Sequence, residues 1–396
     1  MSETTKINLC DLPYPELERF AVEELGFKKF RAGQIWQWIW VRNVSDFEGM
    51  TDLSQKDRAR LAEKAEIRWP KIADVRVSSD GTTKFLLELG DGELIETVLI
   101  PSEAPKRPND ITVRMTQCIS TQVGCAMACS FCSTGKLGFK RNMTMGEILG
   151  QGQVARAYLT DTQPERPIIR NLVYMGMGEP LLNLATVMDS LRTLQHPKGL
   201  AFSPRRITVS TCGIEKGMRE FGDSGLAFLA VSLHAPNQEL REKLMPRAAH
   251  WHLDDLIDAL ADYPLKTRER ITLEYLVIAG VNDQPEHVKQ LARICSRLKA
   301  KLNLIPYNPT PGTPYEAPTP EELLRFEKAL WAKDITAIVR KSKGQDIEAA
   351  CGQLRAAHDA AKAAQQYWEV LQKGIFPSIA EKERPLFSQR PFFIFS

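Results

Sequence analysis

A glycine-flanked loop holds three closely spaced cysteines. Cys125, Cys129 and Cys132 form a C-x3-C-x2-C pattern within eight residues, so their thiolates can surround one small inorganic centre. A structural zinc ion would need a fourth Cys or His at matching spacing, whereas the nearest further cysteine, Cys118, precedes the pattern by seven residues. Three ligands favour a [4Fe-4S] cluster with one open iron, where a substrate can bind.

A second chemical signal is the glycine turn Gly176–Pro180, which follows an apolar run at residues 171–175. Glycines let the backbone approach a ligand closely, so such a turn can hold a cofactor. By itself the turn is typical of an ordinary connection between a strand and a helix. Its place after the cysteine pattern favours the cofactor site.

Strand and helix patterns alternate around these motifs. Apolar and β-branched runs predict strands near residues 112–120, 171–175, 206–211, 226–233, 270–278 and 301–305. The first intervening helix opens with the capping box of Thr144 and Glu147, and the others lie near residues 184–195, 214–222, 253–262, 285–299 and 320–332. Six repeats predict an α/β fold, a partial (β/α)6 barrel whose active site lies at the carboxyl ends of its strands.

The N-terminal region follows another pattern. Apolar residues at helical spacing predict two small helices before about residue 40, and Ser54 with Asp57 predicts the start of a third. Asp-Gly pairs at residues 80–81 and 91–92 then separate three short strand patterns. Together these strands predict an antiparallel meander.

Composition agrees with a chain of more than one folding unit. Of its 396 residues, 43% are apolar and 26% are charged, and the mean hydropathy is −0.27. These values exclude fibrous and wholly disordered classes. We expect an N-terminal helical and β accessory module that binds RNA (1–105), the barrel (106–345), and a C-terminal segment (346–396) with an alanine-rich helical stretch and an aromatic end.

Charge and hydropathy bear on location and partners. No uncharged run reaches the roughly 18 residues of a membrane span, and the N-terminus, with Glu3 and Lys6, has no apolar core of a signal peptide. We therefore expect a cytoplasmic protein without membrane contact. The net charge of +3 is mild, so a nucleic-acid surface must come from local patches.

Four motifs together resemble one enzyme family. They lie at residues 122–125, 131–134, 232–235 and 346–354. Through them the chain, from about Leu9 to Leu354, closely resembles the RlmN family of radical S-adenosylmethionine (SAM) enzymes. The resemblance implies a dual-specificity methyltransferase acting on C2 of adenine, at adenosine 2503 of 23S rRNA and adenosine 37 of tRNA. It implies one [4Fe-4S] cluster per chain on the three cysteines, two SAM molecules per turnover, an electron donor such as flavodoxin, and a monomer.

The same resemblance assigns roles to two further cysteines. Adenine C2 is too electron-poor to attack a sulfonium methyl group, so the reaction needs a radical. Cys351 would take a methyl group from one SAM with its thiolate as nucleophile, and a second SAM would supply the radical that activates this group. Release of 2-methyladenine would then leave Cys351 paired transiently with Cys118, which requires their Cα atoms to lie within about 7 Å.

The family also implies a set of SAM contacts at the predicted strand ends. These are Glu179, Pro180, Ser210, Ser232, Leu233, His234 and Asn308. His234 taken alone would more often be a packed core histidine than a ligand. Glu96 matches the family's proton acceptor, although its own pattern is that of an exposed strand glutamate, and Cys118 is a rival for the same proton. Cys10, Cys212 and Cys295 match no ligand spacing and are interpreted as packing residues.

Basic residues gather in four stretches that could bind RNA around the barrel mouth. They are Lys56, Arg58, Arg60, Lys64, Arg68 and Lys71; Lys136, Lys140 and Arg141; Arg205 and Arg206; and Arg340, Lys341 and Lys343. By charge alone each stretch is more typical of a solvated face. Two other functions stay open: methylation of adenine C8 by a related resistance enzyme of the Cfr type, and RNA binding without catalysis through a zinc knuckle.

Overall fold

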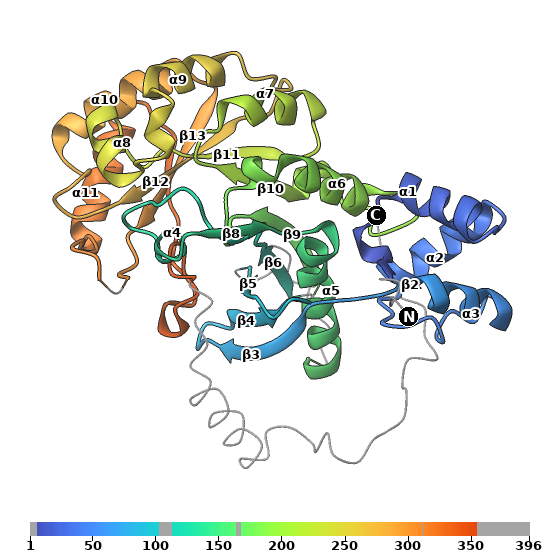
Figure 1. Ribbon diagram of the computed structural model, residues 1–396. Helices are drawn as coiled ribbons and strands as arrows, with labels where there is room; N and C mark the ends of the chain where they lie inside the picture. The colour runs from blue at the N-terminus through green and yellow to red at the C-terminus, as the bar shows by residue number, and fades with distance from the viewer. Residues whose placement is uncertain (1–5, 103–112, 164–167, 311, 355–396) are drawn as a thin grey trace, which may run out of the picture.

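In the computed structural model, residues 6–102, 113–163, 168–310 and 312–354 are described. One ten-stranded sheet runs through them in the order β14-β13-β12-β11-β10-β9-β6-β5-β4-β3 (Figure 1). The alanine-rich and aromatic parts of the predicted C-terminal segment lie outside the described residues.

Seven neighbouring strands of this sheet are parallel and form the open barrel. They are β6 (Arg114–Cys118), β9 (Ile168–Tyr174), β10 (Ile207–Thr211), β11 (Phe228–Ser232), β12 (Ile271–Val277), β13 (Ala300–Pro306) and β14 (Ala337–Val339). The first six confirm the predicted strands. The seventh is three residues long, too short for an apolar period to reveal it.

Helices cover the outer face of the parallel strands (Figure 1). Those that follow the predicted repeats are α5 (Met145–Thr162), α6 (Leu184–Gln195), α7 (Glu215–Ser224), α9 (Leu253–Ala261), α10 (Pro285–Ser296) and α11 (Pro320–Trp331). The capping box of Thr144 and Glu147 is present at the start of α5, as predicted. Two short helices were not predicted, α4 (Ser133–Lys136) and α8 (Gln238–Leu244).

The N-terminal helices are joined to the barrel through α2 (Phe30–Trp40), which is hydrogen-bonded to α5. They are α1 (Tyr14–Arg19), which continues into a π-helical turn (Phe20–Glu24), α2 and α3 (Gln55–Lys64). The Ser54 hydroxyl accepts a hydrogen bond from the Asp57 amide at 3.1 Å, which confirms the predicted start of α3. Strands β1 (Ile7–Asn8) and β2 (Ala65–Glu66) form a small parallel pair, and the Gln153 amide of α5 donates to the Ile39 and Trp40 carbonyls of α2.

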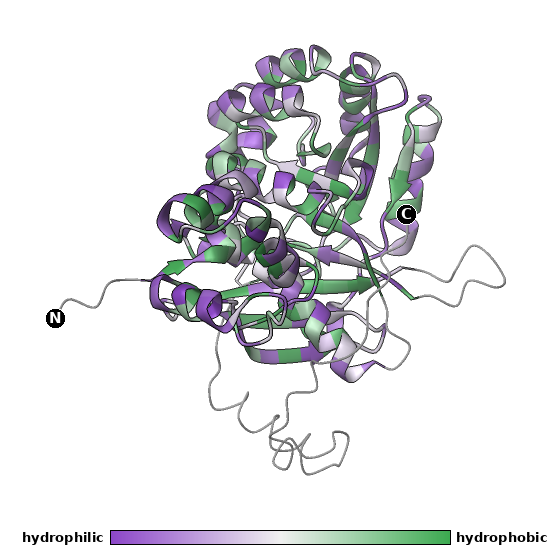
Figure 2. Ribbon diagram, turned by 90° about the vertical axis from the view of Figure 1, so that its right-hand side faces the viewer, coloured by the Kyte–Doolittle hydropathy of each residue, from purple (hydrophilic) through white to green (hydrophobic). Residues whose placement is uncertain are grey.

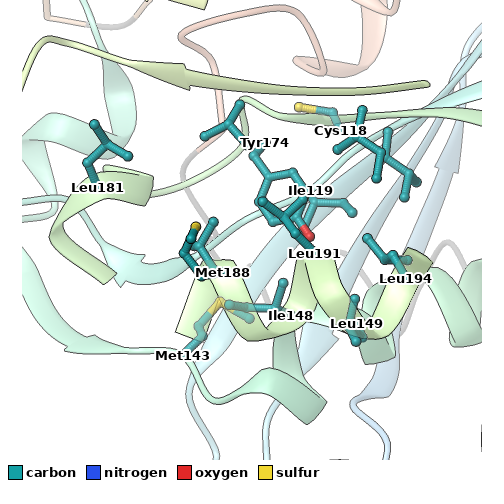
Figure 3. Packing of buried hydrophobic residues seen from close by; sticks show 14 of the residues in the cluster. Cys118, Ile119, Met143, Ile148, Leu149, Tyr174, Leu181, Met188, Leu191 and Leu194 are labelled. Carbon is teal, nitrogen blue, oxygen red and sulfur yellow. The ribbon is translucent and has the colours of Figure 1, made fainter. Parts of the chain in front are cut away.

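The predicted meander is present as β3 (Lys71–Val77), β4 (Thr83–Glu88) and β5 (Leu94–Pro101). It continues the barrel sheet, because β5 pairs antiparallel with β6 and sets Val98 opposite Cys118. The helical face of the sheet is filled by a continuous core, and in Figure 3 the Cys118 thiol points away from Leu191 and Leu194 of that core. Side chains of β5 and β6 that lie on the same face of the sheet as Cys118 therefore point away from the helices.

Hydrophobic residues concentrate in the strands, and the helices alternate hydrophobic and hydrophilic faces (Figure 2). This is the pattern of a sheet covered by amphipathic helices. Among the described residues, no helix is both long and apolar enough to cross a membrane.

Candidate active site

A pocket of about 170 Å³ opens at the carboxyl ends of the parallel strands. A single water molecule needs about 10 to 15 Å³ by the same measure, so the pocket has room for much more. Its wall includes the ends of β9 to β13 and the residues just beyond β14. All three clustered cysteines line it, together with Cys351, so the structure brings them to one place.

The cysteine loop is closed by a hairpin of β7 (Gln122–Gly124) and β8 (Phe139–Asn142). Gly124 has a φ of 74°, and a side chain there would collide with the Gly138 carbonyl oxygen. That oxygen accepts a hydrogen bond from the Cys125 amide at 2.8 Å. Glycine at position 124 therefore permits the turn that carries the first cysteine into the pocket.

The three cysteines are half-buried and line one pocket. Desolvation and repulsion between neighbouring thiolates raise the pKa of Cys125 to about 11 and also raise the pKa values of Cys129 and Cys132. Three thiolates in this place consequently need a positive centre among them. In the described ranges, no three His, Cys, Asp or Glu side chains are arranged to hold a single metal ion.

The glycine turn after β9 packs directly on the residues that lead into the cysteine loop. A side-chain Cβ at Gly176 would lie 2.6 Å from the Ser120 hydroxyl, and one at Gly178 would lie 2.6 Å from the Gln122 Cβ atom. Both glycines also line the pocket. Glycine is therefore needed at both positions, because the backbone there lies against the residues that follow β6 as well as against the pocket.

Glu179 links this turn to the next strand end. Its carboxylate accepts hydrogen bonds from the Leu181 amide at 3.0 Å and the Cys212 amide at 2.8 Å. Burial nevertheless raises its pKa, against the effect of these bonds. The next residue, Pro180, is buried and starts a 3-10 turn (Pro180–Asn183) outside the pocket wall.

Ser210, Ser232 and His234 line the pocket at the ends of β10 and β11. The two serine hydroxyls lie 3.5 Å apart. His234 is buried with a φ of 52°, and its Nδ1 accepts a hydrogen bond from the Leu276 amide at 3.0 Å. Burial and, to a smaller extent, the charge of Arg241 together lower the pKa of His234 to about 3, so the ring is neutral. Leu233 is fully buried in the core and is not part of the pocket wall.

Cys351 is exposed at the pocket edge, and its loop is tied to the cysteine loop. The Ser133 amide donates to the Gly352 carbonyl at 2.8 Å. Asn308 lies outside the pocket wall, but its side-chain amide donates to the Cys351 carbonyl at 3.3 Å. In this structure Asn308 therefore holds the Cys351 loop.

Cys118 is buried at the end of β6, and electrostatic coupling joins it to Cys351. Burial raises the pKa of Cys118 to about 12, and Cys351 adds to this rise while Arg340 opposes it. The two thiols are thus near neighbours across 233 positions of sequence. All eight cysteines lie in the described part of the chain and all are free thiols, so no disulfide joins this pair here.

Glu96 is buried, whereas its sequence pattern alone is that of an exposed strand residue. It is 4% exposed, and its neighbours Ile95 and Thr97 are fully buried, because both faces of β5 are covered. Its carboxylate forms an ion pair with Lys84 at 3.1 Å. Glu96 lies on the Cys118 face of the sheet, two residues from Val98, but outside the pocket wall.

Four residues of the site were missed by sequence reasoning. Cys212, interpreted as a packing residue, is buried, and it also lines the pocket. Glu274 and Arg340 line the pocket as well. Arg340 is half-buried and faces the pocket, and Cys351 is the main cause that raises its pKa. Arg241 is fully buried behind Cys212. None of these stands in a motif with a recognisable spacing.

The predicted basic stretches are partly neutralised. Lys140 pairs with Glu93 at 2.6 Å, and Arg141 pairs with Asp91 and Glu147 at 2.7 and 2.8 Å. Arg205 and Arg206 are exposed beside β10. The positive surface beside the cysteine loop is therefore weaker than the sequence suggests.

Comparison with known proteins gives one consistent family. Residues 7–67 match the family described as "Ribosomal RNA large subunit methyltransferase N-terminal domain", and residues 119–292 match the radical SAM superfamily. The chain is 66% identical over 349 residues to the dual-specificity RNA methyltransferase RlmN of Nitratidesulfovibrio vulgaris (strain DP4), covering 88% of this chain and 95% of the relative. It is 62% identical to the RlmN of Oleidesulfovibrio alaskensis, covering 89% and 96%.

A solved structure agrees with these sequences. The crystal structure of a radical SAM methyltransferase from Sphaerobacter thermophilus matches with a TM-score of 0.81 and 40% identity, covering 89% of this chain and all of that one. The predicted fold, a radical SAM barrel with an N-terminal helical and β part, is confirmed. The chain belongs to the RlmN family of dual-specificity RNA methyltransferases, within the radical SAM superfamily.

Proposed function

We propose that this methyltransferase adds a methyl group to C2 of adenosine in 23S rRNA, at adenosine 2503, and in tRNA, at adenosine 37. The observation that carries the proposal is the pocket that Cys351 lines together with Cys125, Cys129 and Cys132, with Cys118 buried at the end of β6 and interacting electrostatically with Cys351. Two thiols beyond the cluster ligands are what a reaction through an S-methylcysteine needs. Membership in a methyltransferase family sets aside the zinc-knuckle alternative.

Radical SAM membership implies a [4Fe-4S] cluster and SAM. We assign the cluster to Cys125, Cys129 and Cys132, because three partly desolvated thiolates in one pocket need a positive centre. When bound, cluster and SAM supply a 5′-deoxyadenosyl radical, the reagent that electron-poor C2 requires. We expect one cluster per chain, two SAM molecules per turnover and a donor such as flavodoxin.

The SAM contacts carried over from the family remain part of the proposal. Glu179, Ser210, Ser232 and His234 support it, because all four line the pocket. Because Nδ1 of the neutral His234 accepts from the Leu276 amide, Nε2 carries the proton and can donate one hydrogen bond without adding charge. Pro180, Leu233 and Asn308 have side chains outside the pocket wall, so only their backbone or a loop movement would bring them to SAM.

Cys351 would act as the nucleophile that takes a methyl group from the first SAM. The Arg340 guanidinium lines the same pocket, and its pKa is raised chiefly by Cys351. The S-methyl group would then lose a hydrogen atom to the 5′-deoxyadenosyl radical, and the resulting methylene group would bond to C2 of the adenine. Because Cys351 is exposed on a loop, its side chain can reach a base that enters the pocket from solvent.

Cys118 would resolve the covalent adduct. Its sulfur would bond to that of Cys351 while the bond between the Cys351 sulfur and the methylene carbon breaks; that carbon would take up a proton to give 2-methyladenine, and the remaining electron would pass to the cluster. Burial raises the pKa of Cys118 and so favours the unreactive thiol before that step. The C2 proton goes to Glu96 or to Cys118, which can accept it only as the thiolate. Glu96 is held by Lys84 on the same sheet face as Cys118, which supports a role for the carboxylate without choosing between the two.

The division of labour along the chain follows the predicted domains. Residues 1–105 would bind RNA, residues 106–345 would hold the cofactors, and residues 346–396 would carry Cys351. Exposed Lys56, Arg60 and Lys71 on and after α3 support RNA contact by the first part. We further expect a cytoplasmic monomer.

Two mass measurements test this function. Protein purified from SAM-replete cells should carry an increment of about 14 Da on the peptide with Cys351, the mass of the CH2 unit that a methyl group adds on replacing a hydrogen. Digested RNA from a deletion strain should lack 2-methyladenosine and regain it on complementation. An 8-methyladenosine product would instead assign the chain to C8 chemistry of the Cfr type.

A further inference from the structure

Arg241 on α8 is a cation buried among backbone carbonyls. It is fully buried. One guanidinium nitrogen donates to the Leu233 carbonyl at 3.0 Å, and the other terminal nitrogen donates to the Cys212 carbonyl at 2.6 Å. These carbonyls follow β11 and β10, so Arg241 joins the ends of two neighbouring strands behind the pocket.

This cation has no carboxylate partner. No ion pair in the described ranges includes Arg241, and its Nε atom has no hydrogen-bond partner there. A buried charge without a counter-charge is strongly unfavourable. Burial lowers the pKa of Arg241, and the groups that oppose this change are the thiols of Cys212 and Cys129.

The helix that carries Arg241 is attached to the cysteine loop. The Ser130 amide and hydroxyl both donate to the Leu244 carbonyl at the end of α8, at 3.0 and 3.3 Å. Ser130 lies between Cys129 and Cys132. Any movement of α8 would therefore move the loop that holds the cluster ligands, and Arg241 keeps a fixed relation to them.

We infer that Arg241 is an electrostatic positioning residue for the [4Fe-4S] cluster, supplying the buried positive charge that makes its reduction easier. A cluster of this type with three thiolates carries one net negative charge when oxidised and two when reduced. A fixed cation in a water-excluded site favours the added electron, and reduction potentials of such clusters respond to nearby charge. The inference rests on the proposed cluster site.

A purely structural role for Arg241 would be to hold the two strand ends together through its hydrogen bonds to the Leu233 and Cys212 carbonyls. Two substitutions distinguish the effect of the charge from the effect of these hydrogen bonds. Arg241→Lys keeps the charge but loses the fork of two donors, whereas Arg241→Gln can still donate one hydrogen bond and has no charge. Lys243→Gln on the same helix is the matched control, because Lys243 is solvent-exposed and pairs with Glu239.

The experiment is an anaerobic redox titration of the reconstituted full-length proteins without SAM, followed by the electron paramagnetic resonance of the reduced cluster. Iron content and circular dichroism are measured on the same samples. In Arg241→Gln we expect the reduced-to-oxidised ratio at a fixed potential to fall about tenfold, which for one electron corresponds to about 59 mV. Arg241→Lys and Lys243→Gln should stay within about twofold of wild type.

Each outcome decides the matter. A tenfold fall in Arg241→Gln alone supports the inference, as does loss of the cluster from Arg241→Gln but not from Arg241→Lys. Equal shifts in both variants, loss of the cluster from both, or an unchanged potential in an iron-replete Arg241→Gln protein would overturn it. Wild-type protein that binds no iron would overturn the cluster assignment itself, and this inference with it.

Discussion

The Lys84 ammonium group and the Glu96 carboxylate form an ion pair at 3.1 Å, with each side chain only 6% exposed. Lys84 also donates to the Glu348 carbonyl at 3.1 Å. One buried cation thus connects the candidate proton acceptor on β5 with the loop that carries Cys351.

Substitution of Lys84 by Met should lower the free energy of unfolding by about 3 to 5 kcal/mol, because it removes the cation that pairs with the buried Glu96 carboxylate. Chemical denaturation measures this change. The exposed pair of Lys243 and Glu239 is the control, and Lys243→Met should cost about 0.5 kcal/mol or less. If Lys84→Met and Lys243→Met lowered the free energy of unfolding equally, this result would contradict a buried ion pair between Lys84 and Glu96.

Acid should release the Cys351 loop from the turn between β3 and β4. Hydrogen bonds from Ser78 and Ser79 lower the pKa of Asp346. Burial of Asp80 raises its pKa, but hydrogen bonds from Thr82, Gly344 and Ser78 outweigh this effect and lower it to about 2. Both carboxylates are stabilising when ionised, and their contribution is complete above the ordinary Asp pKa.

This contribution falls as the pH drops from the ordinary Asp value of about 4 toward about 2. Hydrogen exchange of the Gly344 and Ser79 amides, which donate to Asp80 and Asp346, should accelerate relative to that of core strands over this window. Asp346→Asn should show faster exchange at Ser79 already at neutral pH. Unchanged exchange in this variant would argue against the attachment.

Replacing Cys125, Cys129 or Cys132 by Ala should abolish iron binding and SAM cleavage and leave the fold intact, because the cysteine loop lies outside the main core. Iron analysis, 5′-deoxyadenosine assay and circular dichroism check the three parts. Cys295→Ala on α10 should keep its iron. A ligand variant that still produces 5′-deoxyadenosine would remove that cysteine from the site.

Cys118→Ala should stall the reaction after the base is attacked, since methylation of Cys351 and radical formation do not use Cys118. The protein should then purify with RNA attached, and ribonuclease digestion should leave a nucleotide on the Cys351 peptide, visible by mass spectrometry. The double variant Cys118→Ala, Cys351→Ala should carry none. An RNA-free Cys118→Ala protein with normal turnover would falsify the resolving role and favour Glu96 as proton acceptor.

Short-range signals predicted much of the fold. The cap of Ser54 with Asp57 and the capping box of Thr144 with Glu147 act over three residues, so sequence alone reveals them. Six parallel strands and six of the covering helices followed from hydrophobic period. Helix α8 and strand β14 did not, because seven and three residues are too few for a period to stand out from loop sequence.

The sequence by itself determined the chemistry of the cysteine loop, since three thiols within eight residues must meet wherever the loop lies. Only the tertiary structure brought Cys118 near Cys351, because that contact depends on how the loop after β14 folds back over the carboxyl ends of the strands. The tertiary structure also decided which charged residues are buried. Glu96 and Arg241 look like surface residues in sequence, but strands and helices distant in the chain cover them and turn ordinary charges into strongly interacting ones.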